Sequence, residues 1–186
     1  MQIIRDYQFV TPKDRGASVA IGNFDGVHVG HQSVIDLALK AAPDAPLGIM
    51  TFEPHPREFF SPDAPAFRLM SAEARAHRLE KVGVEKLYQL NFNQALSSLS
   101  PREFAQQVIT DGLGLAHVVV GADFCFGKGR AGDAQDLLRS AQQYGLGATL
   151  APPHHREDPT APPPATPTHP AHDKAEASQP TPDERG

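Results

Sequence analysis

The sequence contains almost no cysteine and no long apolar run. Its single cysteine, Cys125, excludes a framework of intramolecular disulfide bonds. No apolar run of about 18 residues and no cleavable apolar leader is present, so neither membrane spanning nor export is expected. These absences predict a cytoplasmic protein.

An excess of positive charge is also missing. The formal net charge is -5 and the sequence pI is near 6.0, so the chain has no general attraction to nucleic acid or to an anionic membrane. We expect neither as a partner, and no protein partner can be identified from the sequence. The length of 186 residues predicts a single domain. Any anionic substrate must be held by local groups, so the sequence motifs of this domain are the evidence for a binding site.

The composition changes once, near residue 152. Residues 152–186 contain 10 of the 18 prolines and no Val, Ile, Leu, Met, Phe, Tyr or Cys. Such a segment cannot bury enough apolar surface to offset its ordering entropy. We therefore expect a domain over residues 1–151 and a disordered tail over 152–186. This interpretation is preferred to a tail that binds a protein partner as a Pro-rich ligand, and to a weak metal site formed by the tail histidines His154, His155, His169 and His172.

Before residue 152, strand-like and helix-like runs alternate. The predicted strands are residues 18–21, 47–52, 86–90, 117–120 and 148–150. The predicted helices are residues 30–40, 71–82, 100–111 and 134–144; in the third, Ser100, Pro101 and Glu103 form a helix-start signature. This alternation predicts an α/β fold with a mostly parallel sheet, helices on both faces, and ligand sites beyond the carboxyl ends of the strands.

The first motif, GNFDGVHVGH at residues 22–31, lies between the first predicted strand and helix. Gly22, Gly26 and Gly30 allow the backbone to approach a phosphate chain closely, and the helix start offers unpaired N–H groups. His28 and His31 would project to one side and donate hydrogen bonds to phosphoryl oxygens. The motif predicts an anion site suited to phosphoryl-type transfer, which needs positioning and charge stabilisation rather than a covalent nucleophile.

Two other interpretations of this motif remain open. The segment can be a turn built on Asn23, Asp25 and Gly26, with the two histidines capping or packing. A zinc site is disfavoured because helical zinc pairs more usually have i, i+4 spacing, and no nearby cysteine or second histidine cluster completes a ligand set.

The second motif, TFEPHPR at residues 51–57, follows the second predicted strand. Pro54 and Pro56 fix φ and stiffen this exit, which would present Phe52, His55 and Phe59 as a rigid wall suited to a planar ring. Taken alone, the motif is better explained as a proline-bounded loop whose aromatic side chains cover the core.

The third motif, GADFCFGKGRAGD at residues 121–133, follows the strand predicted at 117–120. Phe124 and Phe126 could stack on an aromatic ligand, Asp123 could orient a ligand group, and Lys128 or Arg130 could meet phosphate. Core packing and turn capping are the structural alternatives.

The cysteine of this loop, Cys125, is expected to be a small buried residue rather than a nucleophile, because the sequence places no base beside it.

Together and in order, GNFDGVHVGH, TFEPHPREFF and VGADFCFGKGRAGD resemble the adenylyltransferase module of the bacterial bifunctional riboflavin kinase and FAD synthetase, over about residues 1–151. The resemblance implies a Rossmann-like nucleotidyltransferase fold. It implies transfer of AMP from ATP to FMN with Mg²⁺, giving FAD and pyrophosphate, so the expected partners are the small molecules ATP and FMN.

The resemblance also implies roles for individual residues. Catalytic roles fall to His28, His31 and Asp123. The ATP site would contain Gly22, Asn23, Phe24, Asp25, Gly26 and Gly30. The flavin would contact Phe52, Pro54, His55, Pro56, Phe124 and Phe126. No metal site formed by protein ligands is implied.

The sequence departs from the family pattern after Leu150. A second nucleotide signature of the form Ser/Thr-Ser/Thr-x-Arg-Ile-Arg and a β-barrel riboflavin kinase domain are missing, so riboflavin kinase activity is not expected. We hypothesise a shifted reading frame or a wrong gene model near residue 152, which resequencing would test. The alternative functions are a non-catalytic flavin- or nucleotide-binding remnant and a nucleotidyltransferase acting on another phosphate acceptor.

Overall fold

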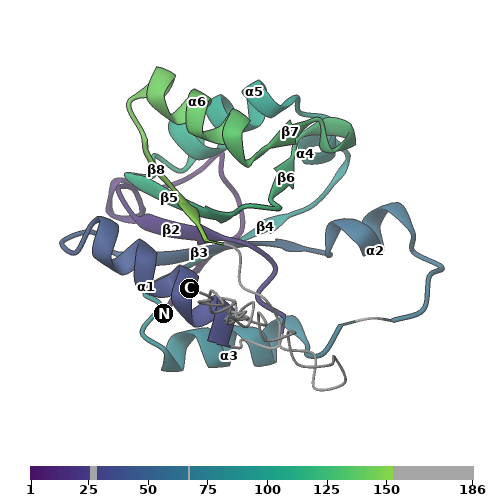
Figure 1. Ribbon diagram of the computed structural model, residues 1–186. Helices are drawn as coiled ribbons and strands as arrows, with labels where there is room; N and C mark the ends of the chain where they lie inside the picture. Colours follow the sequence, from purple (N-terminus) through teal and green to yellow (C-terminus); the bar gives the residue numbers. More distant parts are fainter. Residues whose placement is uncertain (26–28, 67, 153–186) are drawn as a thin grey trace, which may run out of the picture. The chain divides into compact units, whose positions relative to one another are not determined.

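The computed structural model of this protein describes residues 1–25, 29–66 and 68–152, and a parallel β-sheet lies at its centre (Figure 1). Within these residues the sheet is six-stranded, in the order β1-β4-β3-β2-β5-β8, and each neighbouring pair is parallel. The strands are β1 (Gln2–Ile4), β2 (Ser18–Ile21), β3 (Leu47–Glu53), β4 (Lys86–Asn91), β5 (His117–Gly121) and β8 (Gly147–Ala151). The predicted α/β fold with a mostly parallel sheet is confirmed.

Helices and short elements connect these strands. The α-helices are α1 (Val29–Ala41), α2 (Pro56–Phe60), α3 (Ala72–Lys81), α4 (Gln94–Ser97), α5 (Pro101–Glu103) and α6 (Ala134–Tyr144). The other helical elements are the 3₁₀ turns η1 (Pro12–Asp14) and η3 (Lys128–Arg130) and the π-helix η2 (Phe104–Gly112). A short antiparallel pair, β6 (Cys125–Phe126) and β7 (Gly132–Asp133), lies in the loop after β5.

Helices cover both faces of the sheet, because successive side chains of a strand point to opposite faces. On β2, Val19 and Ile21 belong to one buried cluster with η2 and Leu137 of α6. Ala20 between them belongs to a second cluster with Ile35 of α1 and with α3. Figure 1 accordingly shows α5 and α6 on one side of the sheet and α1 and α3 on the other.

Local side-chain caps fix several helix starts. The predicted capping box is present: the Glu103 N–H donates to Ser100 Oγ (3.1 Å), and the Ser100 N–H donates to Glu103 Oε1 (3.2 Å). Ser71 Oγ accepts from the Ala74 N–H (3.1 Å) at the start of α3. The predicted strands and the helices at 30–40, 71–82 and 134–144 are confirmed, each end within one residue.

The predicted helix at 100–111 differs from the structure in its hydrogen bonding. It consists of the short α5 followed by the π-helix η2, where Thr110 Oγ1 also donates to the carbonyl of Ala105 (2.8 Å). The strand β1 and the β6–β7 pair were not predicted. The expected disordered tail lies outside the described residues from 153 onward, and among the described residues no helix is long and apolar enough to cross a bilayer.

Candidate active site

The strand order reverses between β2 and β5, so the expected ligand crevice lies at the carboxyl ends of these two strands. From β2 the chain continues to β3 and β4, toward one edge of the sheet, and later to β5 and β8, toward the opposite edge. The helix after β2, α1, and the helix before β5, η2, belong to opposite faces. Open α/β sheets bind ligands where the strand order reverses in this way. The first and third motifs follow these two strands.

The loop after β2 is anchored to its neighbours. The Gly22 N–H donates to the carbonyl of Met50 on β3 (3.1 Å). Phe24 is only 2% exposed and has a left-handed backbone, with φ of 53°. Its ring packs against the imidazole of His31 in the first turn of α1, with ring centroids 4.9 Å apart. Phe24 therefore contributes its backbone to the crevice, while its ring orients His31.

Three residues of the first motif, Gly26, Val27 and His28, have no described position. The geometry predicted for the pair of histidines therefore stays a prediction. Gly30 lies in the first turn of α1, as the motif predicted for a helix start. The peptide N–H groups at such a helix start favour an anion.

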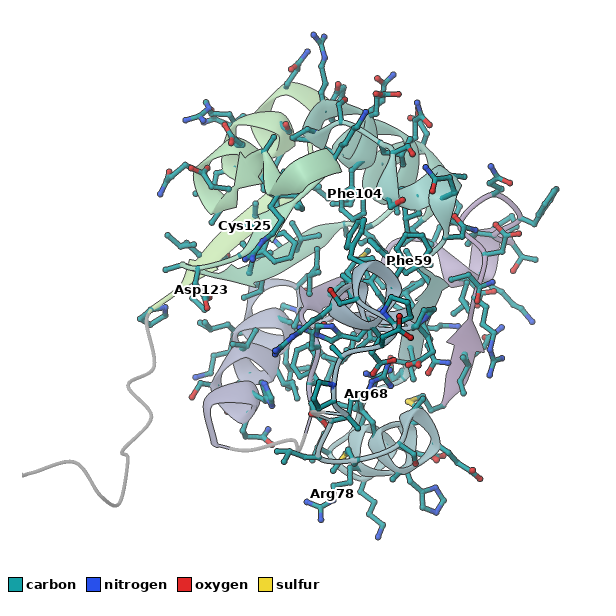
Figure 2. All side chains as sticks on the ribbon, turned by 90° about the vertical axis from the view of Figure 1, so that its right-hand side faces the viewer. Phe59, Arg68, Arg78, Phe104, Asp123 and Cys125 are labelled. Atoms are coloured by element: carbon teal, nitrogen blue, oxygen red, sulfur yellow. The ribbon has the colours of Figure 1, made fainter. Side chains whose placement is uncertain are left out.

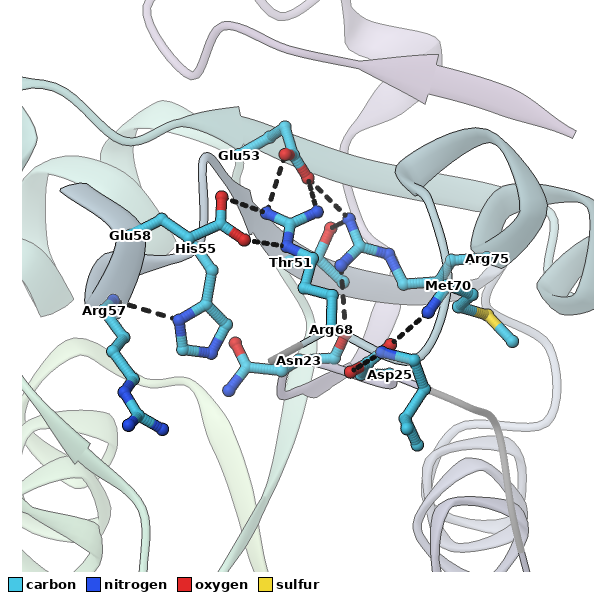
Figure 3. Close-up of polar contacts among 11 residues, drawn as sticks. Asn23, Asp25, Thr51, Glu53, His55, Arg57, Glu58, Arg68, Met70 and Arg75 are labelled. Carbon is cyan, nitrogen blue, oxygen red and sulfur yellow. Dashed lines mark hydrogen bonds and ion pairs between the residues drawn. The ribbon is translucent and has the colours of Figure 1, made fainter. Parts of the chain in front are cut away.

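The side chain of Asp25 connects the first motif to a segment much later in the chain. Its Oδ2 accepts from the Leu69 N–H (2.8 Å) and its Oδ1 from the Met70 N–H (3.1 Å), as Figure 3 shows. Beside it, the carbonyl of Asn23 accepts from Nη1 of Arg75 on α3 (3.1 Å). The first loop is thus held to the segment that leads into α3.

A charged cluster joins this loop to the end of β3. The Glu53 carboxylate accepts from Nη1 and Nη2 of Arg68 (3.0 and 2.7 Å) and from Nη2 of Arg75 (3.2 Å). Arg68 also pairs with Glu58 of α2, and Arg75 Nη2 donates to Thr51 Oγ1 (3.3 Å). Because the charges of two arginines and two glutamates balance, the cluster compensates its own burial.

His55 caps α2 and has a defined tautomer. Its Nδ1 accepts from the Arg57 backbone N–H (3.0 Å), so the ring proton lies on Nε2 (Figure 3). Burial, and then the charge of Arg68, lower the pKa of His55 from its ordinary value, which favours the neutral form. Pro54 is exposed beside His55, and Pro56 is the first residue of α2.

The predicted aromatic wall is part of a larger set of ring contacts. Phe52 of β3 contacts Phe92 (ring centroids 5.8 Å apart) and Phe104 of η2 (6.2 Å). Phe59 of α2 contacts Phe92 edge to face (5.3 Å), and its neighbour Phe60 is 64% exposed. Phe52 therefore packs against the buried cluster that contains Val19, η2 and α6, while α2 adds rings that reach the surface.

The same set of rings continues into the third motif. Phe104 contacts Phe126 of β6 (5.7 Å), which is itself 6% exposed. Phe124 stacks on Phe126 with centroids 5.5 Å apart and planes 12° apart, and it is half-buried. Phe126 is thus a core residue, and Phe124 is the ring of this loop that remains accessible to a ligand.

Asp123 and Cys125 are exposed on the loop that follows β5 (Figure 2). The predicted burial of Cys125 is wrong. Because Cys125 and Phe126 are consecutive in a strand, they point to opposite sides, and burial of the Phe126 ring turns the thiol outward. Asp123 Oδ1 lies 3.0 Å from where a side chain on Gly121 would begin, so a larger residue at 121 would shift the carboxylate by a few tenths of an ångström.

Sequence reasoning missed Glu53, Arg68 and Arg75 as the residues whose side chains hold the first loop beside β3. A signal for Arg75 was present, because it occupies the apolar side of the helix between Ala72 and Leu79 at helical spacing, where a charge is unexpected. Arg68 has no such pattern around it. Among the described residues no group of three or more His, Cys, Asp or Glu side chains could hold a metal ion.

Comparison with known proteins gives consistent matches. The family model for FAD synthetase matches residues 10–161. The chain is 41% identical over 148 residues to a bifunctional riboflavin kinase/FMN adenylyltransferase from Pseudomonas fluorescens, covering 78% of this chain and 47% of that protein. It is 36% identical over 141 residues to an FAD synthetase from Listeria monocytogenes, covering 74% and 56%. The chain spans about half the length of the curated relatives it matches.

A solved structure supports the fold. It is described as a macrolide-efflux protein from Streptococcus pneumoniae and superposes with a TM-score of 0.68 at 29% identity, covering 84% of this chain and 52% of that one.

Proposed function

Because the chain belongs to the FAD synthetase family, we propose that it transfers AMP from ATP to FMN, giving FAD and pyrophosphate. The observation that carries this proposal is the position of the first motif. Its loop and the start of α1 follow β2 at the crevice where the strand order reverses, which is a site for phosphate groups.

The proposed reaction is an in-line displacement. A phosphate oxygen of FMN attacks the α-phosphorus of ATP, a new phosphorus–oxygen bond forms, and the bond to the β-phosphate oxygen breaks as pyrophosphate leaves. Negative charge accumulates on the leaving group and on the equatorial oxygens. The start of α1 and the imidazole of His31, which Phe24 holds by ring packing, are proposed to stabilise that charge together with His28.

The flavin is proposed to bind across the ends of β3 and β5. Phe124 offers an accessible ring on one side, and Phe52, Pro54 and Pro56 form the stiff wall on the other. His55, whose Nδ1 accepts from the Arg57 N–H and whose lowered pKa favours the neutral form, is proposed to line this side of the flavin site. Asp123 is proposed to orient the reacting phosphates from the loop after β5.

Mg²⁺ is proposed to arrive bound to ATP, where it neutralises phosphate charge. Magnesium commonly keeps its waters and takes one or two carboxylates together with substrate phosphates. The exposed Asp123 fits that limited requirement, and no larger set of protein ligands is needed. The proposed place of action is the cytoplasm.

The decisive experiment is a turnover assay with FMN, ATP and Mg²⁺, following FAD by chromatography. We expect FAD from the wild type and a loss of about a hundredfold or more in a variant carrying both His28→Ala and His31→Ala. His77→Ala is the matched control, because His77 is exposed on α3.

Failure of the wild type to form FAD, from folded protein that still binds FMN or ATP, would contradict the proposal and favour the non-catalytic remnant. An equal loss in the His77→Ala control would also contradict the assigned role of the two histidines.

A further inference from the structure

Arg75 is an arginine in an unusual place. It is only 4% exposed, and it lies on the same buried side of α3 as Leu79, which packs in the cluster with Ala20 and α1. Burial is the largest influence on its pKa and lowers it from the ordinary arginine value. Since an arginine stays protonated in proteins, its guanidinium needs compensating acceptors there. One acceptor is the carboxylate of Glu53.

The other acceptor of importance is the carbonyl of Asn23. This carbonyl belongs to the peptide unit that joins Asn23 to Phe24, the residue with the left-handed backbone. A positive φ is uncommon for a phenylalanine and persists when surrounding contacts hold it. The hydrogen bond from Arg75 fixes the orientation of that peptide unit, and burial of the Phe24 ring holds its other side.

The same loop has a second anchor. Asp25 accepts from the backbone N–H groups of Leu69 and Met70, one turn before α3. Arg68, directly before that pair, binds Glu53 through both ends of its guanidinium. Arg68 and Arg75 therefore both donate to the Glu53 carboxylate at the end of β3, as Figure 3 shows, and this links the two anchors.

We infer that Arg75, held by Glu53, is a positioning residue that keeps the Asn23–Asp25 backbone in the conformation that receives the phosphates of ATP. This inference rests on the proposed adenylyltransferase function. Arg75 touches no substrate: it acts through the Asn23 carbonyl. The Glu53 carboxylate orients the guanidinium, because it accepts from Nη2 while the Asn23 carbonyl accepts from Nη1.

The test compares Arg75→Met, Arg75→Lys and Glu53→Gln in the full chain, measuring KM for ATP, KM for FMN and kcat. For Arg75→Met we expect KM for ATP to rise about tenfold to a hundredfold, the loss typical when a charged hydrogen-bond partner behind a ligand site is removed. KM for FMN should change little. Arg75→Lys keeps the charge and one donor, so it should recover part of the loss.

Arg78→Met is the matched control. Arg78 lies on the same helix, is exposed, and projects away from the molecule (Figure 2). We expect its kinetic constants to equal those of the wild type. Equal rises in both KM values for Arg75→Met, or no rise in KM for ATP, would overturn the inference. If Arg75→Met does not fold, Arg75→Lys and Glu53→Gln decide by the same comparison.

A second measurement separates this inference from the proposed function. Amide hydrogen exchange in the substrate-free protein reports whether the Leu69 and Met70 N–H groups stay bound to Asp25. We expect both amides to lose protection in Arg75→Met and to keep it in Arg78→Met. If the wild type makes no FAD but these amides respond as expected, the proposed function fails while the positioning by Arg75 stands. Unchanged protection overturns the positioning.

Discussion

Replacing Lys86 by methionine should destabilise the protein strongly, because it leaves a buried carboxylate without its cation. Asp14 is 5% exposed, and its Oδ1 lies 2.8 Å from Lys86 Nζ. Its Oδ2 keeps two donors in the variant, Gln2 Nε2 (3.2 Å) and Thr11 Oγ1 (2.9 Å). Methionine retains most of the apolar stem of lysine, so lost packing contributes little.

The size of the effect follows from what remains around Asp14. Removing one partner of a buried ion pair costs about 3–5 kcal/mol. Because Oδ2 keeps its hydrogen bonds and Lys86 itself is 14% exposed in its side chain, we expect a loss of about 2–3 kcal/mol in the free energy of unfolding. With a urea dependence of about 1–3 kcal/mol/M, the unfolding midpoint would fall by about 0.7–3 M.

The dependence on pH gives a second signature. The hydrogen bond from Lys86 is the largest cause that lowers the pKa of Asp14, whereas burial raises it. In the wild type, this stabilisation is present above the ordinary aspartate pKa near 3.8 and is lost as the pH falls through the lower folded value. In the variant the largest cause of the lowering is gone, so the folded pKa of Asp14 rises relative to the wild type, and protonation relieves the penalty of the unpaired carboxylate. The difference between the two proteins should therefore shrink as the pH falls.

The assay is urea unfolding followed by circular dichroism at pH 7 and at lower pH, for single and double variants. Adding Asp14→Asn to Lys86→Met should recover at least about half of the loss, because no buried charge is then left unpaired. Lys40→Met is the control, since Lys40 is exposed at the end of α1. A Lys86→Met protein within about 0.5 kcal/mol of the wild type, or no recovery in the double variant, would refute this reasoning.

Two further predictions concern the predicted site. His55→Asn should retain the cap on the Arg57 N–H, but asparagine does not titrate. Because the pKa of His55 is lowered in the folded state, the free energy of unfolding of the wild type should fall as the pH drops below about 6.5. Urea unfolding at several pH values should show a weaker fall in the variant. Gly132→Ala should lower the free energy of unfolding by about 1–3 kcal/mol, because the added Cβ would lie 2.7 Å from Pro101 Cβ and 2.9 Å from the Phe126 ring. Thermal unfolding measures this loss, and an unchanged midpoint temperature would contradict the prediction.

Much of the fold follows from local sequence. The run from Ser18 to Ile21 has three apolar residues after its serine and ends before Gly22, and it forms β2 with the predicted limits. The serine and glutamate of the capping box form the predicted helix start at Pro101 because their partners lie within a single turn. In such segments the interactions that define the element come from neighbouring residues, so the sequence pattern is sufficient.

Other elements depend on packing partners far along the chain. The strand β1 has only three residues and exists through pairing with β4, where Gln2 lies opposite Lys86. Helical periodicity at 100–111 does not distinguish an α-helix from a π-helix, and Gly112 ends η2 against the carbonyl of Tyr7, with no room for a side chain. The orientation of Cys125 similarly depends on which side of β6 faces the core.

The sequence by itself determined the alternation of the five strands β2, β3, β4, β5 and β8 with the helices between them, and it placed three motifs after three of these strands, because these signals reside in short stretches of chain. Only the tertiary structure decided which side chains hold the first motif in place. The partners of Arg75 are Glu53, Thr51 and Asn23, which lie 22, 24 and 52 residues away in sequence. A buried guanidinium needs acceptors within hydrogen-bond distance, and only the packing of α3 beside β2 and β3 brings these residues together.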